Sequence, residues 1–165
     1  MKNFNKVALT LAVYISRFGF LPANISPLGS FGFFGGNLVF YLLVIVGFDI
    51  FKGGFYPGFL FTYLGFFAYW LFGKFAKSQK SKIVLLPAAS FTFFLVSNFG
   101  VWWHWYPHTF SGLLTCYALA IPFYKNTLLG DLLFGYGFLG VKAVQKMVRE
   151  YKMTTTQLHY TPRRP

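Results

Sequence analysis

Two histidines four residues apart are the side chains of this sequence best suited to hold a metal or a cofactor. The spacing of His104 and His108 would place two imidazoles on one helix face, where they could bind a metal, haem or pigment. Pro107 lies between them and disfavours a shared helix, so interfacial hydrogen bonding is the alternative interpretation. The sequence contains no paired-carboxylate motif, metal-spaced cysteine set, phosphate-binding glycine loop or nucleophile elbow. We therefore predict no catalytic residue and no metal site, and leave the cofactor open.

Acidic residues are rare in this chain, and two of them adjoin apolar runs. The sequence holds 3 Asp and Glu residues against 15 Lys and Arg residues. We expect Asp49 to end a helix and reach water beside Lys52. We expect Asp131 near the start of the last helix, where its charge favours the positive helix end. Because ionised groups are unfavourable in lipid, each is either a structural helix-end acid or a functional group.

Polar and aromatic side chains in apolar surroundings are the candidates for binding a small molecule. Arg17 lies near the end of the first apolar stretch, where it could pair with a carboxylate, bind an anion or extend to the interface. Asn98 interrupts an apolar helix and either bonds to another helix or faces a ligand cavity. Asn24 could supply a further polar contact, and Trp102 and Tyr106 could stack on a ligand. The ligand-binding candidates are therefore Arg17, Asn24, Asn98, Trp102 and Tyr106.

The elements that must position these residues are membrane helices. Hydrophobic residues make up 56% of the chain and charged residues 11%, against roughly 25% charged residues in a soluble domain. Ile83 to Tyr124 contains no charged residue. As one helix this run would be roughly 63 Å long, about twice the ~30 Å hydrocarbon core of a bilayer, so it must turn back once. Since backbone groups need internal partners in lipid, and strand-like alternation is absent, the spans are predicted to be helices.

The sequence predicts an all-α, polytopic transmembrane helix bundle of about six helices, or five if the first segment lies at the interface. Residues 1–153 form its single domain, and residues 154–165 form a polar, basic C-terminal tail. A tight connection at Pro122–Asn126 is expected to separate the last two helices. The predicted helices are 4–20, 29–48, 57–76, 82–102, 109–124 and 126–149.

The net charge of +12 is predicted to meet anionic lipid head groups rather than nucleic acid, because the cations lie between and after the apolar runs. From Val141 onward, basic and apolar residues alternate at helical spacing, as in a helix that follows a membrane surface. The count of cations on the two sides favours both termini in the cytoplasm, although the lysine-rich loop 74–82 opposes this orientation.

Small residues spaced four apart predict helix contacts, because helices in lipid associate through close packing. Such contacts would lie either within this chain or against partner subunits. Cys116 belongs to one of these stripes and is expected to serve packing. The other residues of the stripes are Ala8, Ala12, Ser16, Gly32, Gly36, Gly112 and Ala120.

Several short phrases together resemble an uncharacterised family of small polytopic membrane proteins, over about residues 17–140. That family is similar in size and helix count to the S-components of energy-coupling factor vitamin transporters. The resemblance implies six helices, a small molecule bound between them, and docking of a coupling subunit on Ala8 and Ala12. The phrases are Asn24-Ile25-Ser26-Pro27, Phe33-Phe34-Gly35-Gly36, Asp49, Asn98-Phe99-Gly100-Val101-Trp102, Tyr106-Pro107-His108-Thr109, Gly112-Leu113, Cys116-Tyr117, Pro122-Phe123 and Gly130-Asp131.

Three functions remain open from the sequence. The first is a non-enzymatic, multi-pass membrane protein that binds or transports a small molecule as an S-component does. The second is an accessory structural subunit of a large multi-subunit membrane complex. The third is an enzyme or cofactor carrier that uses His104 and His108.

Overall fold

The computed structural model describes residues 10–11, 14–15 and 21–159. The regular elements of this part of the chain are all α-helices and it contains no strand, which confirms the predicted all-α class. The predicted helix 4–20 lies largely outside the described residues. Within residues 21–159 the helices in chain order are α2 (Leu28–Gly35), α3 (Leu38–Phe51), α4 (Phe59–Phe75), α5 (Gln79–Trp105) and α6 (Phe110–His159).

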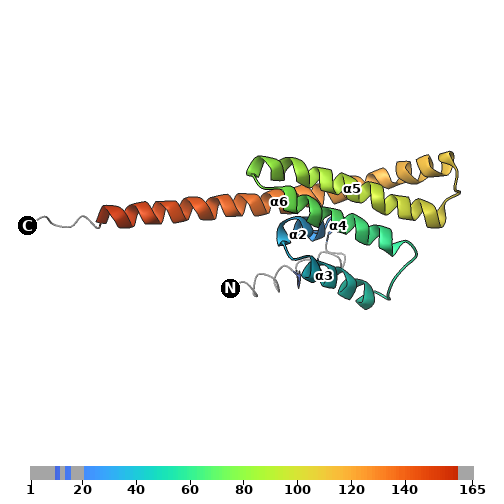
Figure 1. The fold of residues 1–165 in the computed structure, drawn as a ribbon, viewed down its shortest axis with the longest axis horizontal. Coiled ribbons are helices and arrows are strands. Elements are labelled where there is room, and N and C mark those ends of the chain that lie inside the picture. The colour runs from blue at the N-terminus through green and yellow to red at the C-terminus, as the bar shows by residue number, and fades with distance from the viewer. Residues whose placement is uncertain (1–9, 12–13, 16–20, 160–165) are drawn as a thin grey trace, which may run out of the picture.

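The short helix α2 is the centre of the bundle, because it contacts each of the other four helices. Helices α4, α5 and α6 run alongside one another, and α3 lies on the outer side of α2 (Figure 1). Gly73 of α4 allows the closest approach to α2, since a Cβ at this position would overlap the carbonyl of Phe33. The core is mainly apolar and aromatic, with Leu28, Phe31, Tyr41, Ile45, Phe66, Tyr69 and Leu86 among its buried side chains.

The predicted helix 29–48 is wrong as a single element, because the chain breaks after Gly35. Gly36 adopts a left-handed conformation with φ of 71° and ends α2. Asn37 is extended, and its side chain accepts a hydrogen bond of 2.9 Å from the amide of Phe40 at the start of α3. A left-handed glycine that ends one helix, followed by an asparagine that caps the next, is a standard helix break.

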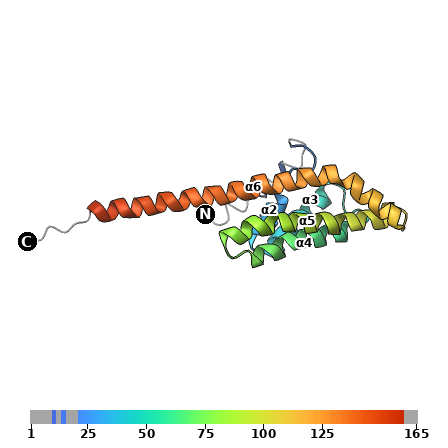
Figure 2. The same ribbon diagram turned by 90° about the horizontal axis from the view of Figure 1, so that it is seen from above.

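The predicted separation of 109–124 from 126–149 is also wrong, because α6 continues through Pro122. Proline removes one backbone donor, but a membrane-type helix tolerates this loss when nearby groups satisfy the backbone. The hydroxyl of Thr127 donates to the carbonyl of Phe123 at 3.1 Å in the turn that follows. The helix bends in its N-terminal half and does not end (Figure 2). By contrast, α4 agrees closely with the predicted 57–76, and α5 extends the predicted 82–102 at both ends.

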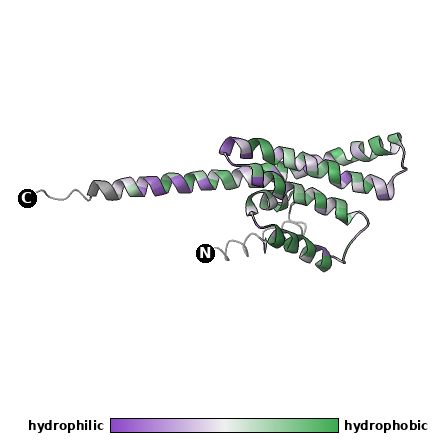
Figure 3. Cartoon of the chain, viewed as in Figure 1, coloured by the Kyte–Doolittle hydropathy of each residue, from purple (hydrophilic) through white to green (hydrophobic). Residues whose placement is uncertain are grey.

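The two ends of the bundle differ in chemistry. At one end, the start of α4 lies beside the end of α5, because a Cβ on Gly58 would be 3.2 Å from Nδ1 of His104. The tryptophan-rich turn of residues 102–106 lies at this end. At the other end, the hydroxyl of Tyr136 donates to the carbonyl of Ile83 at 2.9 Å, so the middle of α6 is level with the start of α5. Beyond this level α6 extends away from the bundle, and hydrophilic residues gather there (Figure 3).

Two of the described helices, α5 and α6, are long and apolar enough to cross a membrane by length and composition. Helices α3 and α4 are apolar but shorter.

Candidate functional site

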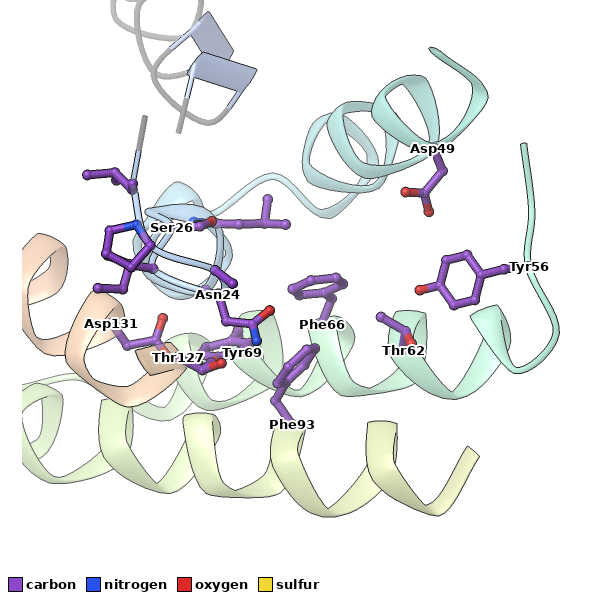
Figure 4. Close-up of a pocket in the computed structure, with 16 residues that line it drawn as sticks. Asn24, Ser26, Asp49, Tyr56, Thr62, Phe66, Tyr69, Phe93, Thr127 and Asp131 are labelled. Carbon is purple, nitrogen blue, oxygen red and sulfur yellow. Dashed lines mark hydrogen bonds between the residues drawn. The ribbon is translucent and has the colours of Figure 1, made fainter. Parts of the chain in front are cut away.

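A cavity of about 540 Å³ lies among the helices α2 to α6 and the irregular segment before α2. Figure 4 shows its lining residues, with Asp131 and Asp49 at opposite ends and the rings of Phe66 and Phe93 between them. The two rings are in contact, with a centroid separation of 4.7 Å. The cavity therefore has two acidic ends and an aromatic middle.

Asp131 forms the inner end of this cavity. The prediction that it lies near the start of the last helix is wrong, because α6 begins at Phe110 and Asp131 is in its interior. Its side chain is 1% exposed, and its carboxylate Oδ2 accepts a hydrogen bond from the hydroxyl of Tyr69. The hydroxyl of Ser30 on α2 donates to the backbone carbonyl of Asp131 at 2.9 Å. Gly29 makes this arrangement feasible, because a Cβ there would overlap both the carboxylate of Asp131 and the ring of Tyr69. Three helices thus meet around one carboxylate.

Asp49 forms the other end of the cavity. It lies in the last turn of α3 and is 7% exposed, and its Oδ2 accepts a 2.8 Å hydrogen bond from the hydroxyl of Tyr63 on α4. Asp49 was expected to reach water at the helix end. It is instead buried, and its carboxylate is hydrogen-bonded to the tyrosine of the neighbouring helix.

The electrostatics of the cavity are opposite to those of the chain as a whole. Two of the three acidic residues of this strongly basic protein line it, and its lining within the described part of the chain contains no Lys, Arg or His. Among the described residues there is one ion pair, which joins Lys146 and Glu150 at 3.6 Å on the exposed part of α6. Neither cavity carboxylate is therefore ion-paired to a described cation. A buried carboxylate without a counter-charge is energetically unfavourable, so the cavity favours a positive charge.

A second cavity of about 360 Å³ adjoins the first. Asn24, Thr62, Phe93 and Thr127 line both cavities. Cys116, which is buried in the lining of the second cavity, donates through its thiol to the carbonyl of Asn98 at 3.5 Å. The two cavities together follow the inner face of α5 and α6.

The irregular segment before α2 provides the polar rim of both cavities. Asn24 has a φ of 69°, a left-handed conformation that asparagine adopts more readily than most residues. The amide of Ile25 donates to the carbonyl of Pro22 at 3.0 Å, which closes a turn around Asn24. The side chain of Asn126 then binds the carbonyl of Ala23 at 2.9 Å and ties this turn to α6.

The structure brings together three of the five ligand-binding candidates. Asn24, Asn98 and Tyr106 line the second cavity. The amide of Asn98 donates to the carbonyl of Phe94 in its own helix at 2.8 Å, and does not bond to another helix through this group. Trp102 lies outside both linings and donates from its ring nitrogen to the carbonyl of Pro107 at 3.1 Å. Arg17 lies outside the described residues.

Sequence reasoning missed the aromatic and hydroxyl side chains of the larger cavity. Tyr69, Phe66, Phe93 and Thr127 are drawn from residue types that recur throughout this chain, which has 24 Phe and 11 Tyr. No spacing distinguishes them from packing residues. A signal existed only in Asp131, whose need for a buried partner predicts a hydroxyl donor on a neighbouring helix.

The small residues predicted to mediate packing occupy different environments. Ala8, Ala12 and Ser16 lie outside the described residues. Gly32 lies against the ring of Tyr41, which a Cβ at Gly32 would overlap. A Cβ at Gly36 would meet no atom within 4 Å, so the lack of a side chain there allows the left-handed end of α2 and not a close helix approach. Gly112 lies against Pro107 of the turn that precedes α6.

The two histidines each bind a backbone carbonyl near the tryptophan-rich turn. Nδ1 of His104 lies 2.8 Å from the carbonyl of Gly100, and Nε2 of His108 lies 2.8 Å from that of Trp103. Both histidines therefore make hydrogen bonds, as the alternative to metal or cofactor binding predicts. Among the described residues, no group of three His, Cys, Asp or Glu side chains is placed to hold a metal ion.

Comparison with known proteins identifies the family but not its activity. A model described as a family of unknown function, DUF6580, matches residues 2–154. The chain belongs to the DUF6580 family. Neither a curated protein nor a solved structure matches it in the same comparisons. The predicted membership of an uncharacterised family is confirmed, whereas nothing in the comparisons supports the resemblance to S-components.

The hydrogen bond between Tyr69 and Asp131 yields a stability prediction for this DUF6580 protein. Tyr69→Phe removes the hydroxyl donor from a buried carboxylate. We expect the free energy of unfolding to fall by about 1–3 kcal/mol, the usual effect of leaving a buried polar group without its partner. Thermal unfolding of the purified protein in mild detergent measures this loss.

The matched control is Tyr136→Phe, which removes a hydroxyl that bonds the carbonyl of Ile83 in a more exposed position. This variant should unfold at a temperature closer to that of the wild type. Equal destabilisation by the two variants would contradict a special role for the bond to Asp131.

Proposed function

We propose that this chain is an integral membrane protein that binds a small molecule in the cavity between Asp49 and Asp131, without catalysing a reaction on it. The observation that carries the proposal is a cavity of about 540 Å³ with buried polar groups at its ends and aromatic side chains between them. Small-molecule sites are typically cavities of about 300–1,000 Å³ with mostly apolar walls and a few placed polar groups.

The surface of the bundle supports a membrane location. Large apolar side chains are exposed on several helices, and most of the bundle has the colour of hydrophobic residues in Figure 3. A soluble monomer rarely exposes a continuous apolar surface of this kind, whereas lipid is a favourable solvent for it. Together with the two helices of spanning length, this favours a bilayer around α5 and α6. The exposed side chains include Leu43, Leu60, Leu64, Phe91, Leu114 and Leu129.

The broken chain around α2 supports a binding role for the cavity. Helix α2 has 8 residues, about 12 Å of helix, which is less than half of a bilayer core. The segment 21–27 before it is not helical. Irregular backbone at membrane depth is tolerated where protein surrounds it or where it lines a cavity, and broken helices form the substrate sites of many transporters. Here the break lines the cavity.

The distribution of cations favours one orientation in the membrane. With α6 as a single helix, the lysine loop and the extension of α6 fall at the same end of the bundle, although the six-helix prediction placed them on opposite sides. Of the remaining described cations, Lys52 lies at the tryptophan-rich end and Lys125 within α6. Cytoplasmic ends collect positive charge, so we assign the lysine loop and the C-terminus to the cytoplasm. The cations at that end are Lys74, Lys77, Lys80, Lys82, Lys142, Lys146, Arg149 and Lys152.

A second candidate function, an accessory subunit of a larger membrane complex, is favoured by the extension of α6. Val141, Val144, Val148 and Tyr151 recur at intervals of three and four residues, and all are about half exposed or more. This spacing places them on one helix face, as in a seam that packs against a partner helix. The extension lies beyond the bundle, so no other described helix covers this face.

Small-molecule binding predicts that filling the cavity will displace the ligand. Thr127→Phe introduces a ring where Thr127 lines both cavities. Purification from the native membrane in mild detergent, followed by mass spectrometry of extracted small molecules, should find a compound in the wild type at near one per chain. We expect its occupancy to fall by about tenfold or more in Thr127→Phe, because a well-packed site cannot accept both the ring and the ligand.

Thr115→Phe is the matched control for this experiment. Thr115 lies on the same helix, is exposed, and also donates its hydroxyl to the carbonyl four residues earlier. It should retain the compound. A wild-type protein that carries no small molecule from its native membrane would contradict the proposed function.

The assigned orientation predicts which cysteine variants react from outside the cell. Lys52→Cys and Lys77→Cys each place a thiol at an exposed lysine position, at opposite ends of the bundle. In right-side-out vesicles a membrane-impermeant maleimide should label Lys52→Cys, and should label Lys77→Cys only after permeabilisation. The parent chain is the control, because its Cys116 is buried. The reverse pattern would overturn the orientation, and labelling of both would argue against a span between them.

The accessory-subunit function predicts a high-mass assembly that depends on the apolar face of α6. Val144→Asp places a charge on this face, and should release the chain from the assembly in blue-native electrophoresis of solubilised native membranes. Met153→Asp adds the same charge to an exposed apolar residue of the same helix, two and a half turns after Val144 and so on the opposite face, and should not. Migration of the wild-type chain only as a small free species would rule out this second candidate.

A further inference from the structure

The two acidic ends of the larger cavity indicate the class of its ligand. We propose that the site binds a linear organic diamine, with one ammonium group at Asp49, the other at Asp131, and the hydrocarbon between them against Phe66 and Phe93. This inference rests on the proposed function and adds the chemical class of the ligand.

The charge of the cavity favours a cationic ligand. Asp49 and Asp131 are 7% and 1% exposed, and the described residues that line the cavity with them include no basic side chain. In a chain of formal charge +12, the concentration of two of its three acids on one cavity selects against anions. A buried carboxylate is stabilised strongly by a cation that also donates hydrogen bonds to it, as a primary ammonium group does.

The separation of the two carboxylates favours a ligand with two positive charges. Figure 4 shows Asp49 and Asp131 at opposite ends of the lining, and they belong to different helices, α3 and α6. One metal ion or one small monovalent cation could neutralise only one of them. A ligand with two positive charges joined by a chain satisfies both ends at once.

The hydrogen bonds of the two carboxylates favour a ligand of defined length. A tyrosine hydroxyl donates to each of them, from Tyr63 to Oδ2 of Asp49 at 2.8 Å and from Tyr69 to Oδ2 of Asp131. These bonds fix the orientation of the carboxylates in the cavity wall. Fixed acceptors at two points favour a ligand of one length over longer and shorter homologues.

The aromatic middle of the cavity favours a hydrocarbon chain between the two ammonium groups. The rings of Phe66 and Phe93 lie between the acids and provide an apolar surface for methylene groups. Aromatic faces also attract ammonium groups that pass over them. A diol of equal length would meet the same apolar surface but would leave both carboxylates without a counter-charge.

The test is a set of binding titrations on the full chain in nanodiscs of zwitterionic lipid, with empty nanodiscs as blank. The probes are the α,ω-diamines from diaminopropane to diaminooctane, with hexylamine, hexanediol and hexanoate as one-charge, neutral and anionic comparisons. We expect one diamine length to bind best, about 30-fold or more tighter than hexylamine or hexanediol, because each buried charge pair is worth a factor of this order. Hexanoate should not bind.

Two isosteric variants and one control assign the effect to the cavity. Asp131→Asn and Asp49→Asn should each lower the affinity for the best diamine to about that of hexylamine. Glu150→Gln removes the third acid, which is paired with Lys146 on exposed α6, and should leave the affinity unchanged. The dependence on diamine length, measured on the wild-type chain, keeps the proposal testable if a variant fails to fold.

Three results would overturn the diamine proposal. The first is equal binding of hexanediol and the diamines, and the second is equal loss of diamine affinity in Glu150→Gln and Asp131→Asn. The third is absence of diamine binding in the wild type, which would follow if Arg17 supplied the counter-charge. Recovery of a neutral or anionic compound from the native protein would overturn the diamine but uphold small-molecule binding. Failure of the proposed function is a separate result, namely a native protein without any bound compound.

Discussion

The hydrogen bond from Tyr69 to Asp131 is the interaction on which the rest of the architecture depends. It joins α4 to α6, and α2 packs against both partners at Gly29. Ser30 of the same short helix binds the backbone of Asp131. An acid in an apolar bundle is unfavourable unless it is hydrogen-bonded. The need to satisfy this carboxylate therefore fixes the relative positions of three helices, and these positions in turn leave the cavity between them.

Much of the fold follows from the apolar runs of the sequence, but the breaks do not follow from residue type alone. The reversal between Ile83 and Tyr124 was predictable, because the run is too long for one span. Pro122 was not, since a proline within a helix and a proline between helices have the same local composition. The outcome depends on tertiary contacts, such as that of Asn126 with the irregular segment. Gly36 and Asn37 carried a readable signal for a break, a left-handed glycine before a capping asparagine, and the apolar residues on both sides obscured it.

The candidate site was only partly readable for a related reason. Asn98 could be selected because amides are rare in apolar helices, and Asn24 because it is a polar residue next to the first apolar stretch; both line a cavity. The larger cavity is lined instead by phenylalanines, tyrosines and threonines that resemble core residues in every local respect. Which of them face a void depends on how α2 inserts between α4 and α6. That insertion is a property of the assembled bundle, and no segment of sequence contains it.

The continuity of α6 has a mechanical consequence. Asp131 and Thr155 belong to one uninterrupted helix, and the 24 residues between them correspond to roughly 36 Å of rigid rod. A tilt of about 5° at the level of Asp131 would swing the far end by about 3 Å. A change in the occupancy of the cavity that tilts α6 is therefore amplified outside the bundle, and α6 can act as a lever from the buried carboxylate to the basic C-terminal extension.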